Sequence, residues 1–324
     1  MVIATGSRAA IPPIPGLDAV EPWDNRGITA ADHVPRRLLV LGGGAIGAEM
    51  AQAFRRLGSA QVTVVEAAPR LLTREEPFAG EQVAAAFESE GIKVIVGMGM
   101  TSVERTADGA VSATLADGST VDGDEILVAV GRRPATTDLG METVGLEAGK
   151  SITVDDRLRV TGVDGDWLYA VGDCNGRSLL THVGKYQARI AGDVILGKDA
   201  RDRVSSDIVP RVTFTDPQVC AVGLTESQAR ERDIDVRTLS VGTGSVSGAY
   251  VSGVGIDGTS FLVVDERRRV LVGATFTGPD VADLLHSATV AIAGQVTLDD
   301  LWHAVPSFPT VSEVWLRLLE QYGL

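Results

Sequence analysis

The stretch 37–66, RLLVLGGGAIGAEMAQAFRRLGSAQVTVVE, limits what this chain can fold into more than any other part of the sequence. An apolar run at 38–41 predicts a buried strand, and a glycine-rich turn follows it directly. Residues 48–57 have helical spacing and end at a glycine, and β-branched residues at 62–65 predict a second strand. A strand, a tight turn, a helix and a further strand together predict a βαβ unit of an α/β sheet.

The glycines of this turn have the spacing G-x-G-x-x-G. Gly42 permits the tight turn, Gly44 lets the backbone approach a pyrophosphate, and Gly47 lets helix and strand pack closely. The N-terminus of the following helix offers N–H groups and a positive dipole end to phosphates. Glu66, which ends the second strand, is suited to accept hydrogen bonds from a ribose diol. These parts in register predict an adenine dinucleotide site.

Glu66 also bears on the choice between NAD and NADP. A carboxylate facing a 2′-phosphate at about 4 Å would cost roughly 1 to 4 kcal/mol, depending on the local dielectric, so NAD is favoured. Arg70 lies close by in the sequence. It either softens this preference or is a solvated charge at a helix end, and the sequence leaves both interpretations open.

Composition excludes several classes of partner. The net charge of −14 and the pI near 4.7 argue against nucleic acid and anionic membranes, because both need a basic surface. No apolar run is long enough to span a membrane. The two cysteines, Cys174 and Cys220, form no CxxC, metal cluster or disulfide framework. We therefore expect no metal site and a cytoplasmic location.

The remaining segments complete an α/β chain followed by an α+β region. An apolar strand at 167–171 ends in Gly172-Asp173, where open α/β sheets bind ligands. Beyond it, antiparallel strands and a helix predict a separate domain. The other expected elements are a helix at 80–90, strands at 93–96, 111–115 and 126–130, a hairpin turn at Asp117-Gly118, strands at 211–215, 261–265 and 269–278, and a helix at 281–294.

Six short motifs in a fixed order carry a resemblance to a known family. They are VIATGS, GGGAIGAE, VAVGRRP, LYAVGD, FTDPQVCAVGLTE and PTVSE. Together they resemble the pyridine nucleotide–disulfide oxidoreductases, with most similarity to the dihydrolipoamide dehydrogenase and mercuric reductase branch. The resemblance covers essentially the whole chain.

The resemblance implies a Rossmann-like NAD domain inserted in a truncated FAD domain, followed by an α+β dimerisation domain that makes a homodimer. We place an FAD-domain remnant at 1–32, the NAD-binding domain at 33–152, the second FAD-domain segment at 153–204 and the dimerisation domain at 205–324.

The resemblance also assigns site residues. Asp173 matches the acid that holds the ribityl chain of FAD, and Glu49 matches a glutamate that pairs with a lysine beside the flavin. The matched FAD contacts are Thr5, Gly6, Ser7, Asp173, Leu179, Leu180, Thr181 and His182. The matched NAD contacts are Gly42, Gly43, Gly44, Ala45, Ile46, Gly47, Glu49, Glu66 and Gly131, to which we add Arg70.

Three features of the family have no counterpart in these 324 residues. In the family, three features precede the segment that matches VIATGS at residues 2–7. They are a first flavin-binding G-x-G-x-x-G, a C-x-x-x-x-C redox pair and the lysine that pairs with the glutamate matched by Glu49. We identify one G-x-G-x-x-G, the one at Gly42, and no C-x-x-x-x-C. We therefore expect an N-terminally truncated copy. The loss of a few hundred Å² of apolar cover, at roughly 25 cal/mol per Å², predicts that this chain alone does not retain FAD.

A further departure lies near the C-terminus. In the family a histidine stands five residues before a glutamate and acts as general acid–base in the partner's active site. Glu313 occupies the glutamate position, but Phe308 occupies that of the histidine, and a phenyl ring accepts no proton. His303 is out of register and reads as a structural or surface residue. Glu313 stays the candidate catalytic residue, and Phe308 is a candidate apolar wall for a flat acceptor.

Two main interpretations of function follow. The first is a flavin-dependent NAD(P)H oxidoreductase that passes hydride from NADH to FAD and on to a small-molecule acceptor, namely a disulfide, a metal ion or a quinone. The second is a non-catalytic NAD-binding and dimerisation fragment without flavin. A third is an NADH oxidase or ferredoxin reductase, although the motifs FTDPQVCAVGLTE and PTVSE weigh against a ferredoxin reductase.

Overall fold

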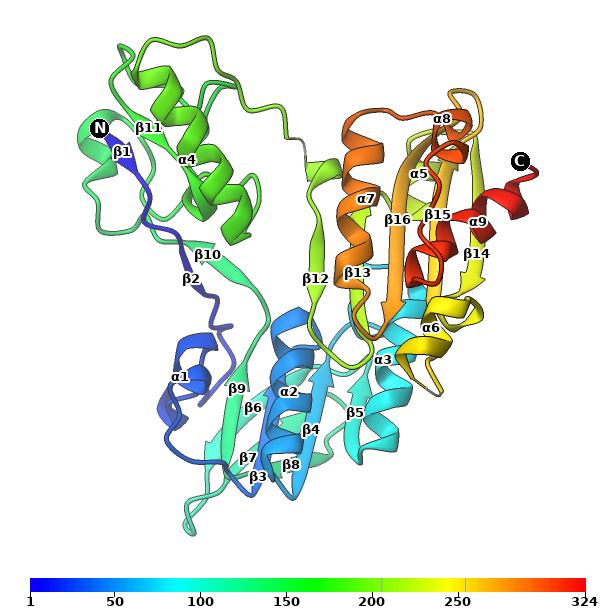
Figure 1. Cartoon of the computed structure of the whole chain (residues 1–324). Coiled ribbons are helices and arrows are strands. Elements are labelled where there is room, and N and C mark those ends of the chain that lie inside the picture. The colour runs from blue at the N-terminus through cyan, green and yellow to red at the C-terminus, as the bar shows by residue number, and fades with distance from the viewer. Residues whose placement is uncertain (205, 254) are drawn as a thin grey trace. The chain divides into compact units, whose positions relative to one another are not determined.

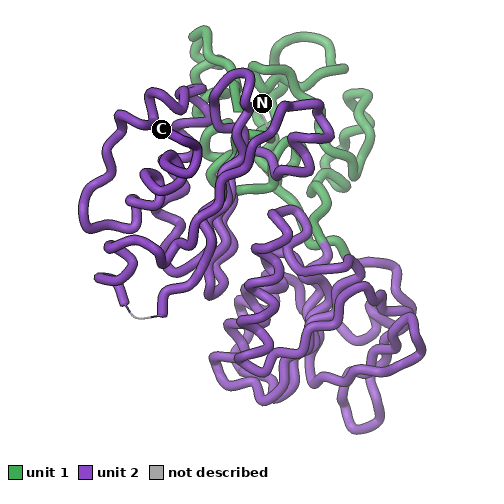
Figure 2. The backbone as a smooth tube through the Cα atoms, turned by 90° about the vertical axis from the view of Figure 1, so that its right-hand side faces the viewer, with its two compact units in different colours: residues 1–10, 131–209 green, residues 11–130, 210–324 purple. Residues whose placement is uncertain are grey.

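The chain forms two compact units, each built from separate stretches of sequence. A computed structural model describes residues 1–204, 206–253 and 255–324. The first unit contains 1–10 and 131–209, and the second contains 11–130 and 210–324 (Figure 2). Among the described residues, no helix combines the length and the apolar character needed to cross a membrane.

A four-stranded parallel sheet forms the centre of the 11–130 part. Its order is β5-β4-β3-β9, so β3 and β4 of the predicted βαβ unit lie side by side, with Leu41 opposite Val65. The helix between them begins at Ala45, three residues before the predicted start. The strands are β3 Arg37–Leu41, β4 Gln61–Glu66, β5 Ile92–Val96 and β9 Glu125–Val128, and the helix is α2 Ala45–Leu57.

Alternate residues of this sheet face two different layers, as expected for strands buried on both faces. Leu38 and Val40 face α2 and α3, which lie together on one side (Figure 1). Leu39 and Leu41 face an antiparallel three-stranded sheet on the other side. The additional elements are α1 Asn25–Thr29, α3 Pro77–Ser89, β6 Met100–Arg105, β7 Val111–Leu115 and β8 Thr120–Gly123, with the predicted hairpin turn between β7 and β8.

The described residues of the first unit form two short sheets and one long helix. In one sheet β1 and β11 pair in parallel, and in the other β2 and β10 pair antiparallel. Its buried core includes Leu158, Ala170 and Cys174. The elements are β1 Val2–Ile3, β2 Ser7–Ala9, β10 Arg132–Pro134, β11 Tyr169–Ala170, the 3₁₀ turn Gly172–Asn175 and α4 Thr181–Ile195.

Residues 210–324 form a five-stranded antiparallel sheet of order β12-β13-β16-β15-β14. The expected strands and the helix that ends before Gly294 are present, and Trp315 of α9 packs on Phe276 of β16. The elements are β12 Arg211–Thr213, β13 Gln218–Gly223, α5 Glu226–Glu231, β14 Val236–Gly242, α6 Ser247–Ser252, β15 Thr259–Asp265, β16 Val270–Gly278, α7 Ala282–Ala293, α8 Leu298–Trp302 and α9 Val314–Tyr322.

The compact units divide the chain at other points than the boundaries placed from sequence. Leu17 and Val20, assigned to the FAD-domain remnant, belong to the core beside β6 and β7. Met141 and Ile152, assigned to the NAD domain, belong to the core of the first unit. Packing rather than motif position therefore sets the divisions, at 10/11, 130/131 and 209/210. Residue 205, where the last domain was placed to begin, lies outside the described residues.

Candidate functional site

The glycine turn at the carboxyl end of β3 is held by close backbone contacts. Gly42 has φ +110°, and a Cβ there would lie 2.6 Å from the carbonyl oxygen of Ala129. A Cβ at Gly47 would lie 1.9 Å from the carbonyl oxygen of Gly42. Neither position has room for any side chain, so these two glycines fix the path of the chain from strand to helix.

The Glu66 carboxylate is held against the same turn from the end of the neighbouring strand. The N–H of Gly43 donates to one carboxylate oxygen at 2.6 Å, and the N–H of Ala68 donates to the other at 2.7 Å. Each oxygen keeps acceptor capacity, because an ionised carboxylate has about four lone-pair sites. Glu66 is thus a fixed acceptor at the edge where the predicted ribose would lie.

The first turn of α2 faces open space. Gly44 caps the helix with φ −75° and ψ −174°, and a Cβ there would meet no other described atom within 4 Å. Ala45, Ile46 and Gly47 form the first turn, whose N–H groups lack helical partners and carry the positive dipole end. This open, positive turn beside a fixed carboxylate fits the phosphates and ribose of a dinucleotide.

Two other predicted NAD contacts have backbone partners of their own. Glu49 accepts a hydrogen bond from the N–H of Phe214 at 2.8 Å, and burial raises the pKa of its carboxyl. The carbonyl of Gly131 accepts from the N–H of Ala10 at 3.0 Å. Gly131 has φ +139°, and its unit is the one that contains the predicted FAD contacts.

Arg70 is turned toward the backbone of its own loop. Its guanidinium donates to the carbonyl oxygens of four residues between 71 and 75. The sequence left two roles open for Arg70, namely a charge for a 2′-phosphate and a solvated charge at a helix end. A guanidinium that donates to four backbone carbonyl oxygens matches neither role.

Within the first unit, the structure brings Ser7 and Asp173 together. They follow the carboxyl ends of the paired parallel strands β1 and β11, and the Ser7 hydroxyl donates to the Asp173 carboxylate. Arg132, which the sequence interpretation passed over, donates from Nε to the Ser7 hydroxyl at 2.7 Å and lies 3.7 Å from the Asp173 carboxylate. In the sequence, the motif VAVGRRP is the one feature that points to Arg132, which follows Gly131 directly.

The other predicted FAD contacts surround the same strand ends. Thr5 and Gly6 form the turn between β1 and β2, with Gly6 at φ +71°. Leu179 precedes Leu180, the N-cap of α4, and Thr181 and His182 begin the 15-residue helix. Gln187 of α4 was not predicted. Its side-chain oxygen accepts from the N–H of Gly172 at 2.8 Å, which ties α4 to the turn that carries Asp173.

Glu313, Phe308 and His303 line one hollow of about 430 Å³ on the 210–324 part. Glu313 is 7% exposed, and its carboxylate accepts from the N–H of Gly248 at 3.3 Å. Phe308 is 75% exposed. The hollow therefore combines a buried carboxylate with an exposed ring, and His303 lies on it despite its place in the sequence.

Both cysteines are buried and free. Burial raises the pKa of the Cys220 thiol to about 12 and also raises that of Cys174. Cys174 donates weakly to the carbonyl of Val171 at 3.3 Å. Thiols with raised pKa values are poor nucleophiles. In the part of the chain that the structure describes, no group of three or more His, Cys, Asp or Glu side chains is arranged to hold a metal ion.

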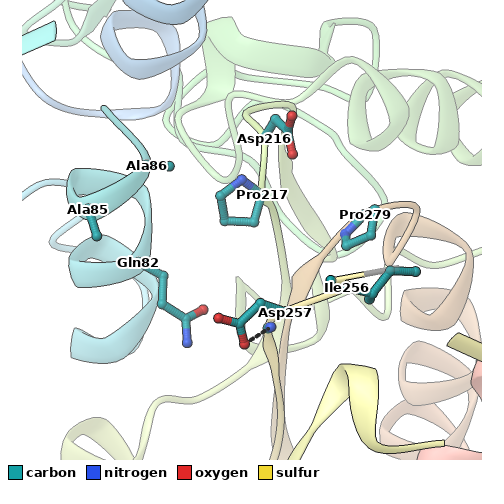
Figure 3. A pocket seen from close by; sticks show the side chains of 10 residues that line it. Gln82, Ala85, Ala86, Asp216, Pro217, Ile256, Asp257 and Pro279 are labelled. Carbon is teal, nitrogen blue, oxygen red and sulfur yellow. Dashed lines mark hydrogen bonds between the residues drawn. The ribbon is translucent and has the colours of Figure 1, made fainter. Parts of the chain in front are cut away.

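The sequence contains a second G-x-G-x-x-G spacing, so the prediction of a single one is wrong. It consists of Gly253, Gly255 and Gly258, and residue 254 within it lies outside the described residues. It leads into strand β15 rather than a helix, so it has no helix N-terminus for phosphates. Gly255 and Gly258 line a hollow of about 500 Å³ into which Gln82 and Asp257 point (Figure 3). The acidic side chains of Asp216 and Asp257 there make an anion site unfavourable.

Comparison with known proteins places the chain in a family. A sequence model of the family described as pyridine nucleotide-disulphide oxidoreductase matches residues 1–188, and the model of its dimerisation domain matches residues 209–318. The chain belongs to the pyridine nucleotide-disulphide oxidoreductases. The resemblance stated from the motifs is thereby confirmed, as is the class of fold. Members of this family contain FAD and use NAD(P)H.

Several relatives cover nearly all of the chain. Mercuric reductase of Bacillus cereus is 31% identical over 316 residues, which is 96% of this chain and 49% of that protein. Dihydrolipoyl dehydrogenase of Thermus scotoductus is 35% identical over 327 residues, which is 98% of this chain and 69% of that protein. The chain thus spans between about half and two thirds of the length of these relatives.

Solved structures agree with these relatives. LpdA of Mycobacterium tuberculosis matches 100% of this chain and 69% of its own, with 28% identity and a TM-score of 0.87. The flavoprotein disulfide reductase RclA of Escherichia coli, in a Cu(II) complex, matches 98% of this chain and 73% of its own, with 27% identity and a TM-score of 0.88.

Proposed function

We propose that the protein is an FAD-dependent NAD(P)H oxidoreductase that moves reducing equivalents from NADH to a small-molecule acceptor. Membership of the family and the names of the relatives support this class of reaction. The acceptor is a disulfide, a metal ion or a quinone. When bound, the flavin supplies the electron-transfer chemistry, while the protein's residues bind and orient the two cofactors.

One observation carries the nucleotide half of this proposal. The Glu66 carboxylate, fixed by the N–H groups of Gly43 and Ala68, lies beside a helix N-terminus with open space at Gly44. A pyrophosphate fits the positive turn, and a ribose diol fits the carboxylate. Because the carboxylate would repel a 2′-phosphate, NAD is proposed over NADP.

For the flavin, support comes from the carboxyl ends of β1 and β11. Asp173 would hold the ribityl chain, and Arg132 with Ser7 would fix the position of its carboxylate. Thr181 and His182, in the first turn of α4, would offer the positive end of a 15-residue helix to the electron-rich edge of the ring. Thr5, Gly6, Leu179 and Leu180 would complete the backbone contacts.

A second candidate function is an NAD-binding and dimerisation module without electron transfer. It is favoured by the absence of a C-x-x-x-x-C pair from the 324 residues and by Phe308, which replaces the expected proton acceptor. In either case we propose a cytoplasmic homodimer. The matched dimerisation domain supports the dimer, and two buried cysteines without a disulfide support the compartment.

Titration with NADH tests the nucleotide half. We expect NADH fluorescence to change saturably on addition of the protein, with NADPH binding about tenfold or more weakly because of Glu66. Substitution Glu66→Gln should narrow the difference between the two nucleotides. A folded protein with no saturable response to NADH would refute the proposal.

Flavin absorbance and turnover separate the two candidate functions. Purified protein that is yellow and oxidises NADH with a quinone or a disulfide supports the oxidoreductase. Colourless protein that binds NADH but does not oxidise it in the presence of added FAD supports the non-catalytic module.

A further inference from the structure

The loop 70–76, which follows β4, is organised by a single guanidinium. Nη1 of Arg70 donates to the carbonyl oxygens of Leu71 at 3.2 Å and Leu72 at 2.8 Å. Nη2 donates to those of Thr73 at 3.2 Å and Glu75 at 2.7 Å. Four of the five N–H donors of the side chain are thus directed at one turn of backbone.

This loop in turn holds Gly43, which lies between the motif glycines Gly42 and Gly44 of the nucleotide turn. The N–H of Leu72 donates to the carbonyl of Gly43 at 3.0 Å. The side chain of Leu71 lies against Gly43 so closely that a Cβ there would be 2.5 Å from its Cδ2 atom. The other polar group of Gly43, its N–H, is bound by Glu66. The position of Gly43 therefore depends on where the loop places Leu71 and Leu72.

The far end of the loop is anchored by two buried carboxylates. Glu75, 8% exposed, accepts two hydrogen bonds from the Arg211 guanidinium, at 2.9 Å and 3.0 Å. Glu76, 4% exposed, accepts from the N–H of Glu226 at 2.7 Å. Because Arg70 also bonds the carbonyl of Glu75, it joins the anchored end of the loop to the end that touches Gly43.

We propose that Arg70 is a positioning residue for nucleotide binding, acting through Leu71 and Leu72 on Gly43. Its donors point at carbonyl oxygens, so it orders the loop rather than binding a 2′-phosphate. The inference rests on the proposed NAD site and names a determinant of that site which binds neither phosphate nor ribose.

The test compares Arg70→Gln and Arg70→Lys with Arg74→Gln, which removes the same charge from an exposed residue of the same loop. Hydrogen exchange of the Leu72 amide is measured first, on protein without nucleotide. We expect exchange to rise about tenfold or more in Arg70→Gln, because several charge-assisted hydrogen bonds are lost, and to stay unchanged in Arg74→Gln. Unchanged exchange in Arg70→Gln would overturn the proposal.

Nucleotide titrations on the same variants distinguish positioning from direct binding. Positioning predicts that affinities for NADH and NADPH fall by the same factor, whereas a phosphate ligand predicts a loss for NADPH alone. Arg70→Lys keeps the charge but not the planar fork, so it should resemble Arg70→Gln and replaces it if that variant does not fold. Failure of the unsubstituted protein to bind NADH would refute the proposed function, while the exchange measurement would still decide the role of Arg70.

Discussion

The glycines of the nucleotide turn differ in what they exclude. At Gly42 and Gly47 a side chain would collide with backbone, at 2.6 Å and 1.9 Å respectively, so these two residues serve the fold. At Gly44 the backbone is extended and a side chain would enter open space. No contact among the described residues requires a glycine at Gly44, as expected if the backbone here is to be approached by the proposed pyrophosphate.

Alanine substitutions separate these roles. We predict that Gly44→Ala changes the free energy of unfolding by no more than about 1 kcal/mol, the range for an N-cap change. Because its methyl group would occupy the space of the pyrophosphate, NADH affinity should fall by at least about tenfold. Gly47→Ala should instead cost about 3 kcal/mol, since helix and strand must move apart.

Urea denaturation and NADH titration measure both effects. Gly99→Ala, also with open space at its Cβ position, is the matched control for the glycine change itself. A Gly44→Ala variant that binds NADH as well as the parent would mean that the pyrophosphate lies elsewhere.

At the scale of elements, the loop after β4 meets the start of α5. The N-terminus of α5 carries a capping box, in which Thr225 and Gln228 bond each other's N–H groups. The Glu76 carboxylate accepts the next N–H of that helix, at Glu226, and burial raises the pKa of Glu76 above its usual 4.5. The hydrogen bond between the Glu76 carboxylate and the N–H of Glu226 therefore has good geometry, but burial disfavours the charged form of that carboxylate.

This conflict predicts a pH-dependent stability difference. Because the folded-state pKa of Glu76 is raised, the protein loses stability as pH rises from about 4.5 through that raised value. Glu76→Gln keeps an acceptor oxygen without the charge, so the variant should gain stability relative to the parent over the same interval, and the gain should level off above it. Thermal unfolding across pH 4 to 8 measures this, with the exposed Glu81→Gln as control. A difference in stability between variant and parent that stays constant from pH 4 to 8 would contradict the prediction.

The βαβ unit and the dimerisation strands were predictable because their signals are local. The run 37–66 carries its own periodicity, turn glycines and end signals. The partner of Glu49 was not predictable, since Phe214 lies 165 residues away and contributes only a backbone N–H. Arg132 has the same difficulty, because its contacts to Ser7 and Asp173 exist only once β2 and β10 pair. A contact made to a backbone group, or formed only when distant strands pair, produces no recognisable spacing of residues in the sequence.

At the scale of the whole molecule, the dimerisation domain has several exposed apolar side chains. Val290 on α7 is 53% exposed, and Val305 and Phe308, in the segment after α8, are 84% and 75% exposed. Tyr250 on α6 is 80% exposed. Apolar groups left this open on a domain matched as a dimerisation domain indicate the surface by which two copies would associate.

A double substitution tests that surface. We predict that the parent sediments at twice its mass of 33.9 kDa and that Val290→Asp with Val305→Asp sediments as a monomer. Each carboxylate buried without a partner would cost roughly 2 to 4 kcal/mol. A dimer would bury four of them, and the total of about 8 to 16 kcal/mol would offset the roughly 8 kcal/mol that holds a dimer of micromolar affinity. Leu196→Asp, at a side chain 75% exposed in the other unit, is the control and should leave the dimer intact.

Because the substituted side chains are exposed in the subunit, unfolding free energies measured in urea should change by no more than about 0.5 kcal/mol once dimer dissociation is accounted for. A double variant that still sediments as a dimer would move the interface away from α7 and the segment after α8, and a parent that stays monomeric at high micromolar concentration would contradict the proposed homodimer.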